Sequence, residues 1–243
     1  LFVDFPYDLY AGNPYWVPPL KMSEYQRFSA RKNPFFKDCE TAFWICVDDD
    51  NTVLGRVAGI WHRHKNQDCR FGFIDFVDDM QVSRLLLETV ARWGRDLGLT
   101  KMLGPLGFSD LDPQGILVEG FDELGNVGTS YHFSYYQEHF ERLSFEKDCD
   151  WIEFKFELGN TYPTVLSKIN QRAQRRLGLE LLELKSWRSL KPWLNQMFDL
   201  VNITYATYYG FVPLSSQHRA FYLSMFKPLM KASYVPLLVD KQG

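Results

Sequence analysis

The sequence lacks the signatures of several large classes of protein. Four cysteines are present, at Cys39, Cys46, Cys69 and Cys149. They form no Cys-x-x-Cys pair and no zinc-type spacing with the five histidines, so we expect free thiols and no metal site. No apolar run reaches the roughly 18 residues of a membrane-spanning helix, and no signal peptide opens the chain. These absences favour a protein of the reducing cytoplasm.

A strong charge of one sign is missing as well. The formal net charge is -3 and the isoelectric point is near 6.0, so no overall field would attract nucleic acid or an anionic membrane. We therefore expect neither as a partner. Hydrophobic residues make up 46% and charged residues 23% of the chain, which is typical of a globular protein with a substantial core.

The stretch in the middle of the chain contains a strand, a return strand, a helix and a further strand in succession. Val53–Trp61 and Arg70–Val77 are runs of β-branched, aliphatic and aromatic residues typical of strands. Apolar residues at helical spacing follow, with Asp79 placed to cap the helix start and Gly98 to end the helix. Leu99–Gly104 is the next predicted strand. A crossover helix of this length predicts parallel pairing of the flanking strands.

Further predicted elements extend this central stretch on both sides. Thr41–Val47 reads as a strand that forms a hairpin with the strand after it. Ser134–Leu143 has a helical pattern, and Trp151–Leu158 alternates apolar and charged residues as a half-buried strand does. We expect these elements to complete a first lobe.

The second part of the chain repeats features of the first. Helices are predicted over Tyr162–Leu177 and Leu190–Tyr208, and Phe211–Leu214 is similar to Trp16–Leu20. We therefore predict a first lobe over residues 1–160, a linker helix and connection over 161–182, and the start of a second, similar lobe over 183–243. The chain begins without methionine and stops at 241–243, a turn directly after a strand-like run, so we expect a fragment of a longer protein.

The order of these elements resembles the GNAT superfamily of acyl-CoA N-acyltransferases. Seven short stretches are similar to bacterial GNAT-like N-acetyltransferases that contain two lobes in tandem: Gly12–Leu20, Lys32–Phe36, Gly55–Ile60, Gly72–Asp79, Gly104–Pro105, Gly120–Asp122 and Tyr135–Tyr136. The resemblance covers most of residues 1–158. It implies an α+β fold with a central mixed, mostly antiparallel sheet flanked by helices. It also implies transfer of an acyl group to a small amine, with a homodimer as the assembly to test for.

The resemblance implies a place for the co-substrate, acetyl-CoA or another acyl-CoA. The superfamily holds it on a splayed strand and the start of the next helix, which correspond here to Ile74, Phe76, Val77, Val82 and Ser83. This chain departs from the usual glycine-containing loop, because Asp78 and Asp79 stand where the pyrophosphate would lie. One alternative is a clasp of backbone groups over residues 74–77. The other is a complete site in the second lobe.

Two side chains are candidates for proton transfer. Asp75 lies in the aromatic strand, where the resemblance implies a general base for the amine, and a salt bridge to Arg56 or Arg70 is the alternative. Tyr135 begins the helix near which the superfamily keeps a tyrosine that protonates the leaving thiolate. Tyr136 shares the apolar face of that helix, so it is predicted to be a core residue.

Three further residues are candidates for a substrate pocket. They are Trp16, Tyr131 and His132. Trp16 can equally pin an arm to the sheet, and a lone loop histidine is often only hydrogen-bonded. Two hypotheses result: an N-acyltransferase with a modified first lobe, and a non-catalytic GNAT-like lobe that binds a ligand or supports the second lobe and a dimer.

Overall fold

The computed structural model describes residues 1–63, 68–126, 128–157, 164–228 and 230–240. The chain divides into two compact units, Leu1–Cys149 with Tyr205–Phe221, and Asp150–Thr204 with Tyr222–Gly243. The lobe boundaries expected from the sequence remain a prediction. The predicted turn at 241–243 lies outside the described residues.

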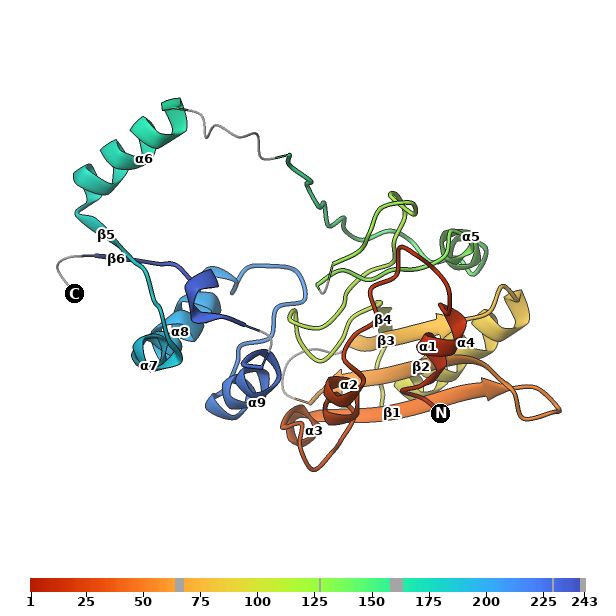
Figure 1. Ribbon diagram of the computed structural model, residues 1–243. Coiled ribbons are helices and arrows are strands. Elements are labelled where there is room, and N and C mark those ends of the chain that lie inside the picture. Colours follow the sequence, from red (N-terminus) through yellow and green to blue (C-terminus); the bar gives the residue numbers. More distant parts are fainter. Residues whose placement is uncertain (64–67, 127, 158–163, 229, 241–243) are drawn as a thin grey trace. The chain divides into compact units, whose positions relative to one another are not determined.

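A four-stranded sheet in the order β1-β2-β3-β4 forms the centre of the first unit (Figure 1). The antiparallel strands are β1 (Cys39–Val47), β2 (Val53–His62) and β3 (Asp68–Phe76). The short strand β4 (Lys101–Leu103) pairs in parallel with the beginning of β3. The hairpin, the crossover and the mixed, mostly antiparallel sheet are therefore confirmed.

Two helices cover one face of this sheet. The helix α4 (Met80–Asp96) begins where the Asp79 side chain accepts a hydrogen bond from a backbone N–H of the first turn, and the chain leaves it through Gly98 at a φ of 76°. The helix α5 (Tyr135–Arg142) confirms the helix expected there. Their apolar sides meet the sheet in one core: Val57, Cys69, Phe71, Ile74, Phe76, Val82, Leu86, Leu87, Val90, Leu99, Tyr136 and Phe140. Each large apolar side chain buried there contributes about 1.5–3 kcal/mol.

The N-terminal arm covers the opposite face. It carries three short helices, α1 (Phe5–Leu9), α2 (Lys21–Arg27) and α3 (Phe35–Asp38), and α1 contacts β2 and β3. Aromatic rings attach it to the sheet: Phe28, for example, packs edge-on against Phe43 with ring centroids 5.6 Å apart. In Figure 1 α1 lies on the near side of the sheet and α4 on the far side.

A β-bulge interrupts the pairing of β2 and β3. Arg56 lies opposite Asp75 and Ala58 opposite Gly72, so two residues of β3 face one residue of β2. Within the bulge, Phe73 has a φ of 47°, an uncommon conformation for a residue with a bulky side chain. Its ring packs 4.8 Å from that of Phe28 in the arm. Asp75 lies on the same arm-facing side, as the alternation of the strand predicts.

The second unit has its own small core. Leu184, Leu190 and Ala232 are buried together, beside a two-stranded antiparallel sheet. The remaining elements of the chain are α6 (Thr164–Leu177), β5 (Leu179–Leu182), α7 (Trp187–Leu190), η1 (Lys191–Trp193), α8 (Leu194–Thr204), α9 (Ser216–Phe226), η2 (Ala232–Tyr234) and β6 (Leu237–Asp240).

Two expected elements differ from the structure. The prediction of a half-buried strand over Trp151–Leu158 is wrong for its described part, because residues 151–157 form no strand and their side chains are exposed; Leu158 lies outside the described residues. Alternation predicts a strand only where a sheet is available to cover one side. The helix expected over Leu190–Tyr208 is shorter in the structure: α8 spans Leu194–Thr204 and follows η1, where Pro192 has no backbone N–H to donate.

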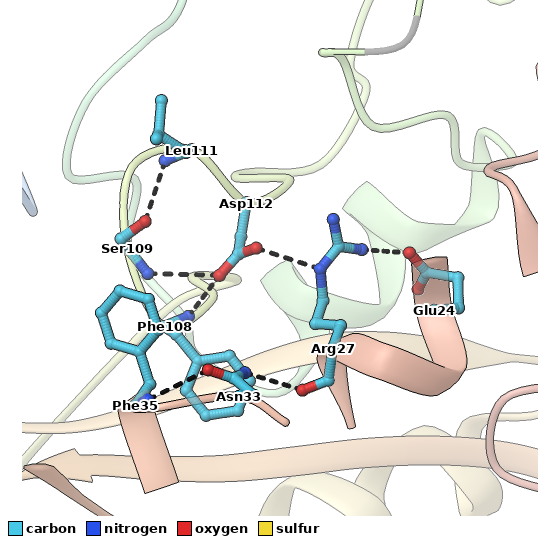
Figure 2. A network of polar contacts seen from close by, with 8 residues as sticks. All are labelled: Glu24, Arg27, Asn33, Phe35, Phe108, Ser109, Leu111 and Asp112. Atoms are coloured by element: carbon cyan, nitrogen blue, oxygen red, sulfur yellow. Dashed lines mark hydrogen bonds and ion pairs between the residues drawn. The ribbon is translucent and has the colours of Figure 1, made fainter. Parts of the chain in front are cut away.

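Buried charges tie the arm to the loop after β4 (Figure 2). Arg27 forms ion pairs with Glu24 in its own helix and, through Nε at 3.1 Å, with Asp112. The other oxygen of Asp112 accepts hydrogen bonds from the backbone N–H groups of Phe108 at 2.9 Å and Ser109 at 3.2 Å. Desolvation raises the pKa of both carboxyl groups. One arginine therefore compensates two carboxylates that burial disfavours.

The substitution Arg27→Gln should lower the free energy of unfolding by about 3–5 kcal/mol, because it leaves two buried carboxylates without their cation. Since Glu24 and Asp112 hold protons more tightly in the folded state, the stability of the variant should fall as pH rises from about 4 to 7. Urea unfolding across this pH range measures both effects.

The control is Arg63→Gln, which removes an ion pair to Glu40 whose two side chains are 42% and 43% exposed. That change should cost less than about 1 kcal/mol. Equal losses in the two variants would show that the buried network does not hold the arm.

Candidate functional site

Asp75 lies at the centre of a buried polar cluster near the end of β3. Its Oδ2 accepts a hydrogen bond from Nε of Arg56 at 2.7 Å, and its Oδ1 accepts one from the hydroxyl of Tyr10 at 3.0 Å. Arg56 also donates to the backbone carbonyl of Phe2 at 2.9 Å. Asp75 is 6% exposed and Tyr10 2% exposed. Of the two alternatives for a salt bridge, the structure contains the one with Arg56.

Two tyrosines of α5 bind the backbone of the same strand. The Tyr135 hydroxyl donates to the carbonyl of Phe76 at 2.6 Å, and the Tyr136 hydroxyl oxygen accepts from the N–H of Phe76 at 3.0 Å. The hydroxyls of Tyr136 and Tyr10 are 3.3 Å apart. The N–H of Val77 donates to Leu54 across the strand pair at 2.9 Å. Groups expected to meet the pantetheine of acyl-CoA are therefore already hydrogen-bonded within the protein.

Burial sets the protonation of the aromatic hydroxyls. Desolvation raises the pKa of Tyr10, Tyr135 and Tyr136, and the negative charge of Asp75 raises each of them further. All three phenols therefore stay protonated at neutral pH. The hydroxyl of Tyr10 donates to Asp75, which leaves its oxygen as one acceptor for the Tyr136 proton at 3.3 Å, beside the Phe76 carbonyl at 3.4 Å.

Asp79 caps the start of α4, and His139 of α5 contacts the residues around it. Asp79 accepts from the backbone N–H of Gln81 at 2.7 Å, and the N–H of Ser83 donates to the carbonyl of Asp79 at 3.1 Å. His139 of α5 joins Asp78, 3.0 Å from its Nε2, to the hydroxyl of Ser83, 2.9 Å from its Nδ1. Both Val82 and Ser83 are buried. A pyrophosphate at this helix start would meet two carboxylates and occupied amides.

The three predicted pocket residues gather around two tyrosines that sequence reasoning did not select as site residues. The ring of Tyr10 is 5.2 Å from that of Trp16 and 5.8 Å from that of Tyr131. The ring of His132 is 4.8 Å from that of Tyr136. Tyr10 lies 65 residues from Asp75 in sequence, so only the folded arm reveals the contact. Tyr136 was correctly predicted as core, but its hydroxyl also binds Phe76.

Neither a metal site nor a transmembrane helix is found in the described part of the chain. No group of three or more histidine, cysteine, aspartate and glutamate side chains there is arranged to hold a metal ion. No helix in the described ranges combines the length and the apolar character needed to cross a bilayer. All four cysteines are free thiols.

Two curated bacterial proteins are similar to this chain along most of its length. Protein YghO of Escherichia coli (strain K12) is 25% identical over 225 residues, which cover 90% of this chain and 56% of that protein. Bacterial ceramide synthase of Caulobacter vibrioides (strain NA1000 / CB15N) is 26% identical over 220 residues, which cover 87% of this chain and 56% of that protein. The chain thus spans about half the length of these relatives. No family model and no solved structure matches it.

The GNAT resemblance remains a prediction, and so do the roles expected for Asp75, Tyr135 and the cofactor-binding residues. The structure places the predicted catalytic and pocket residues in one cluster, with the cofactor-binding residues on the adjoining strand end and helix start. It also shows that this cluster is internally hydrogen-bonded and largely buried. Ligand access therefore needs a rearrangement of the arm or of α5.

Two conservative substitutions distinguish the contact of Tyr136 with the backbone of Phe76 from that of Tyr135. Tyr136→Phe should lower the free energy of unfolding by about 1–3 kcal/mol, because the buried N–H of Phe76 loses its acceptor. Hydrogen exchange at that amide should become faster. Tyr135→Phe removes only the donor to the Phe76 carbonyl, so it should cost about 0.5–1.5 kcal/mol and leave the exchange of the Phe76 amide unchanged. The same exchange rate in all three proteins would contradict the Tyr136 contact.

Because its side chain is buried, His132 should make the folded protein less stable in acid. It is 6% exposed, and burial lowers its pKa to about 4 from an ordinary 6.5. The unfolded chain therefore binds a proton at higher pH than the folded chain, so stability falls as pH drops from 6.5 to 4, by up to about 3 kcal/mol. His132→Asn keeps an acceptor for the N–H of Leu117 and should flatten this slope in urea unfolding. An unchanged slope would show that folding does not shift the pKa of His132 and would contradict this prediction.

Proposed function

We propose that this chain is part of an acyl-CoA-dependent N-acyltransferase that acts on an amine. The observation that carries the proposal is the similarity over 87% of the chain to a protein named bacterial ceramide synthase. Ceramide contains an acyl group in amide linkage to a long-chain amino alcohol, so a protein that makes it forms an amide bond. The mixed sheet flanked by helices is compatible with the acyltransferase resemblance of the sequence.

In this proposal Asp75 accepts the proton of the amine and Tyr135 protonates the departing thiolate of CoA. The polypeptide already places a carboxylate and two protonated phenols at the end of one strand. For Asp75 to reach an amine, the hydroxyl of Tyr10 must leave Oδ1. The pantetheine would likewise replace the tyrosine contacts to Phe76, with acetyl-CoA or a longer acyl-CoA as the donor.

A second candidate is a first unit that supports the transferase without performing the chemistry. The hydrogen bonds of the Phe76 carbonyl with Tyr135 and of the Phe76 N–H with Tyr136 favour it, because they occupy the strand groups that would hold the co-substrate. The carboxylates Asp78 and Asp79 at the start of α4 favour it too. In that case the acyl-CoA is held by another part of the protein.

The transferase proposal is tested by thiol release from the full-length protein. Acetyl-, octanoyl- or palmitoyl-CoA should yield free CoA thiol only when an amine is present, with a long-chain amino alcohol and a short primary amine as the two acceptors. No amine-dependent release with any donor would overturn the proposal.

The two candidates for the first unit are then separated by Asp75→Asn and Tyr135→Phe in the same protein. If the unit performs the chemistry, each change should lower kcat by about 10²-fold or more and alter KM little. If it only supports the fold, kcat should follow the fraction of folded protein. Calorimetric titration of the 243-residue chain with acyl-CoA gives an independent reading. If the backbone of Phe76 stays bonded to the two tyrosines, no acyl-CoA should bind at millimolar concentration.

A further inference from the structure

A pocket lies at the opposite end of β3 from Asp75. It has a volume of about 260 Å³ and is formed within the first unit. Its lining includes Asp68, Arg70, Lys101, Asp148, Tyr209 and Gly210. Asp68 and Lys101 begin β3 and β4. Arg70 and Asp75 are five positions apart, roughly 16 Å along an extended strand, so the pocket is separate from the cluster around Asp75.

Arg70 carries a buried charge into this pocket. It is 9% exposed, and its guanidinium donates to the backbone carbonyls of Gly107 at 3.3 Å and Gly210 at 2.9 Å. Both acceptors are neutral. Within the described ranges, no carboxylate lies within ion-pair distance of Arg70. A buried cation without a directly paired carboxylate is unfavourable, since hydrogen bonds to carbonyl groups compensate only part of the lost hydration.

Two other arginines of the same unit form the ion pair with a carboxylate that Arg70 lacks. Arg56 pairs with Asp75, and Arg27 pairs with two carboxylates. The contrast is informative because Arg70 is about as deeply buried as Arg56. Arg70 lines a pocket, whereas the guanidinium of Arg56 contacts Phe2 of the arm.

We propose that this pocket binds the oxyanion group, carboxylate or phosphate, of a small ligand. Arg70 supplies the buried cation at the floor, with a planar fork of donors suited to an oxyanion. Lys101 adds a second positive charge where β4 begins, and its side chain is exposed. The pocket also contains carboxylates: Asp148 accepts a hydrogen bond from the hydroxyl of Tyr209, and Asp68 lines the wall. These carboxylates favour a compact anion bound close to Arg70 over an extended polyanion.

The proposal is tested by titrating the 243-residue chain with inorganic phosphate and, separately, with acetate, while NMR follows the Arg70 Nε–H and the amide of Gly210. Saturable shifts at both groups, with a dissociation constant on the order of 1–10 mM or lower, are expected for at least one anion. The anion that binds with the lower dissociation constant identifies the class of oxyanion, phosphate or carboxylate. No saturable shift at Arg70 with either anion would overturn the proposal.

Substitutions test the specificity of the site. Lys101→Gln changes an exposed residue, so the fold should persist while the affinity falls about three- to tenfold. The matched control Lys32→Gln alters an exposed lysine that does not line the pocket and should leave the affinity unchanged. Arg70→Lys should retain weakened binding, and Arg70→Gln should abolish it. If Lys101→Gln and Lys32→Gln bind equally, the anion is attracted only by general surface charge and the proposal fails.

Discussion

The ion pair between Arg56 and Asp75 is the interaction on which the first unit depends. It joins neighbouring positions of β2 and β3, and the two side chains are only 8% and 9% exposed. Both partners also hold the N-terminal arm, through the carbonyl of Phe2 and the hydroxyl of Tyr10. A buried ion pair adds little net stability compared with apolar packing, but an unpaired member is costly. The pair therefore fixes where the arm docks more than how strongly the sheet forms.

The aromatic cluster beside this pair links three parts of the chain that lie far apart in sequence. Tyr10 of the arm, Phe76 of β3 and Tyr136 of α5 contact one another through hydroxyl and backbone groups, and the rings of Phe76 and Tyr136 stack 4.1 Å apart. The Tyr10 hydroxyl donates to Asp75, and the Tyr136 hydroxyl accepts from the N–H of Phe76. Buried phenols are tolerated here because every polar atom in the cluster has a partner. That satisfaction also engages both the N–H and the carbonyl of Phe76, where a ligand would meet the strand.

Local signals predicted the central elements correctly. Asp79 and Gly98 mark the ends of α4 because capping depends on a few neighbouring residues. The short connection between the first two strands predicted the hairpin for the same reason. The predicted core role of Tyr136 also held, because helical spacing depends only on its own turn of α5. These parts of the fold follow from chemistry within about ten residues.

Long-range features could not be read from the chain. Arg56 and Arg70 were equal candidates for pairing with Asp75 until the register placed Arg56 opposite it. The bulge at Phe73 could not be predicted from its neighbours in sequence. Its conformation is supported by the ring of Phe28, which only the folded arm brings close. The alternation over residues 151–157 shows the converse, since a strand pattern produced no strand without a neighbouring edge.

The position of the arm also limits what Asp75 can do. Both carboxylate oxygens are engaged, one by a cation and one by a phenol. Loss of the Tyr10 contact would free Oδ1 to meet an incoming group, while Oδ2 remained on Nε of Arg56. Access to Oδ1 of Asp75 therefore requires Tyr10, directly after α1, to move, and this movement can leave the ion pair with Arg56 intact.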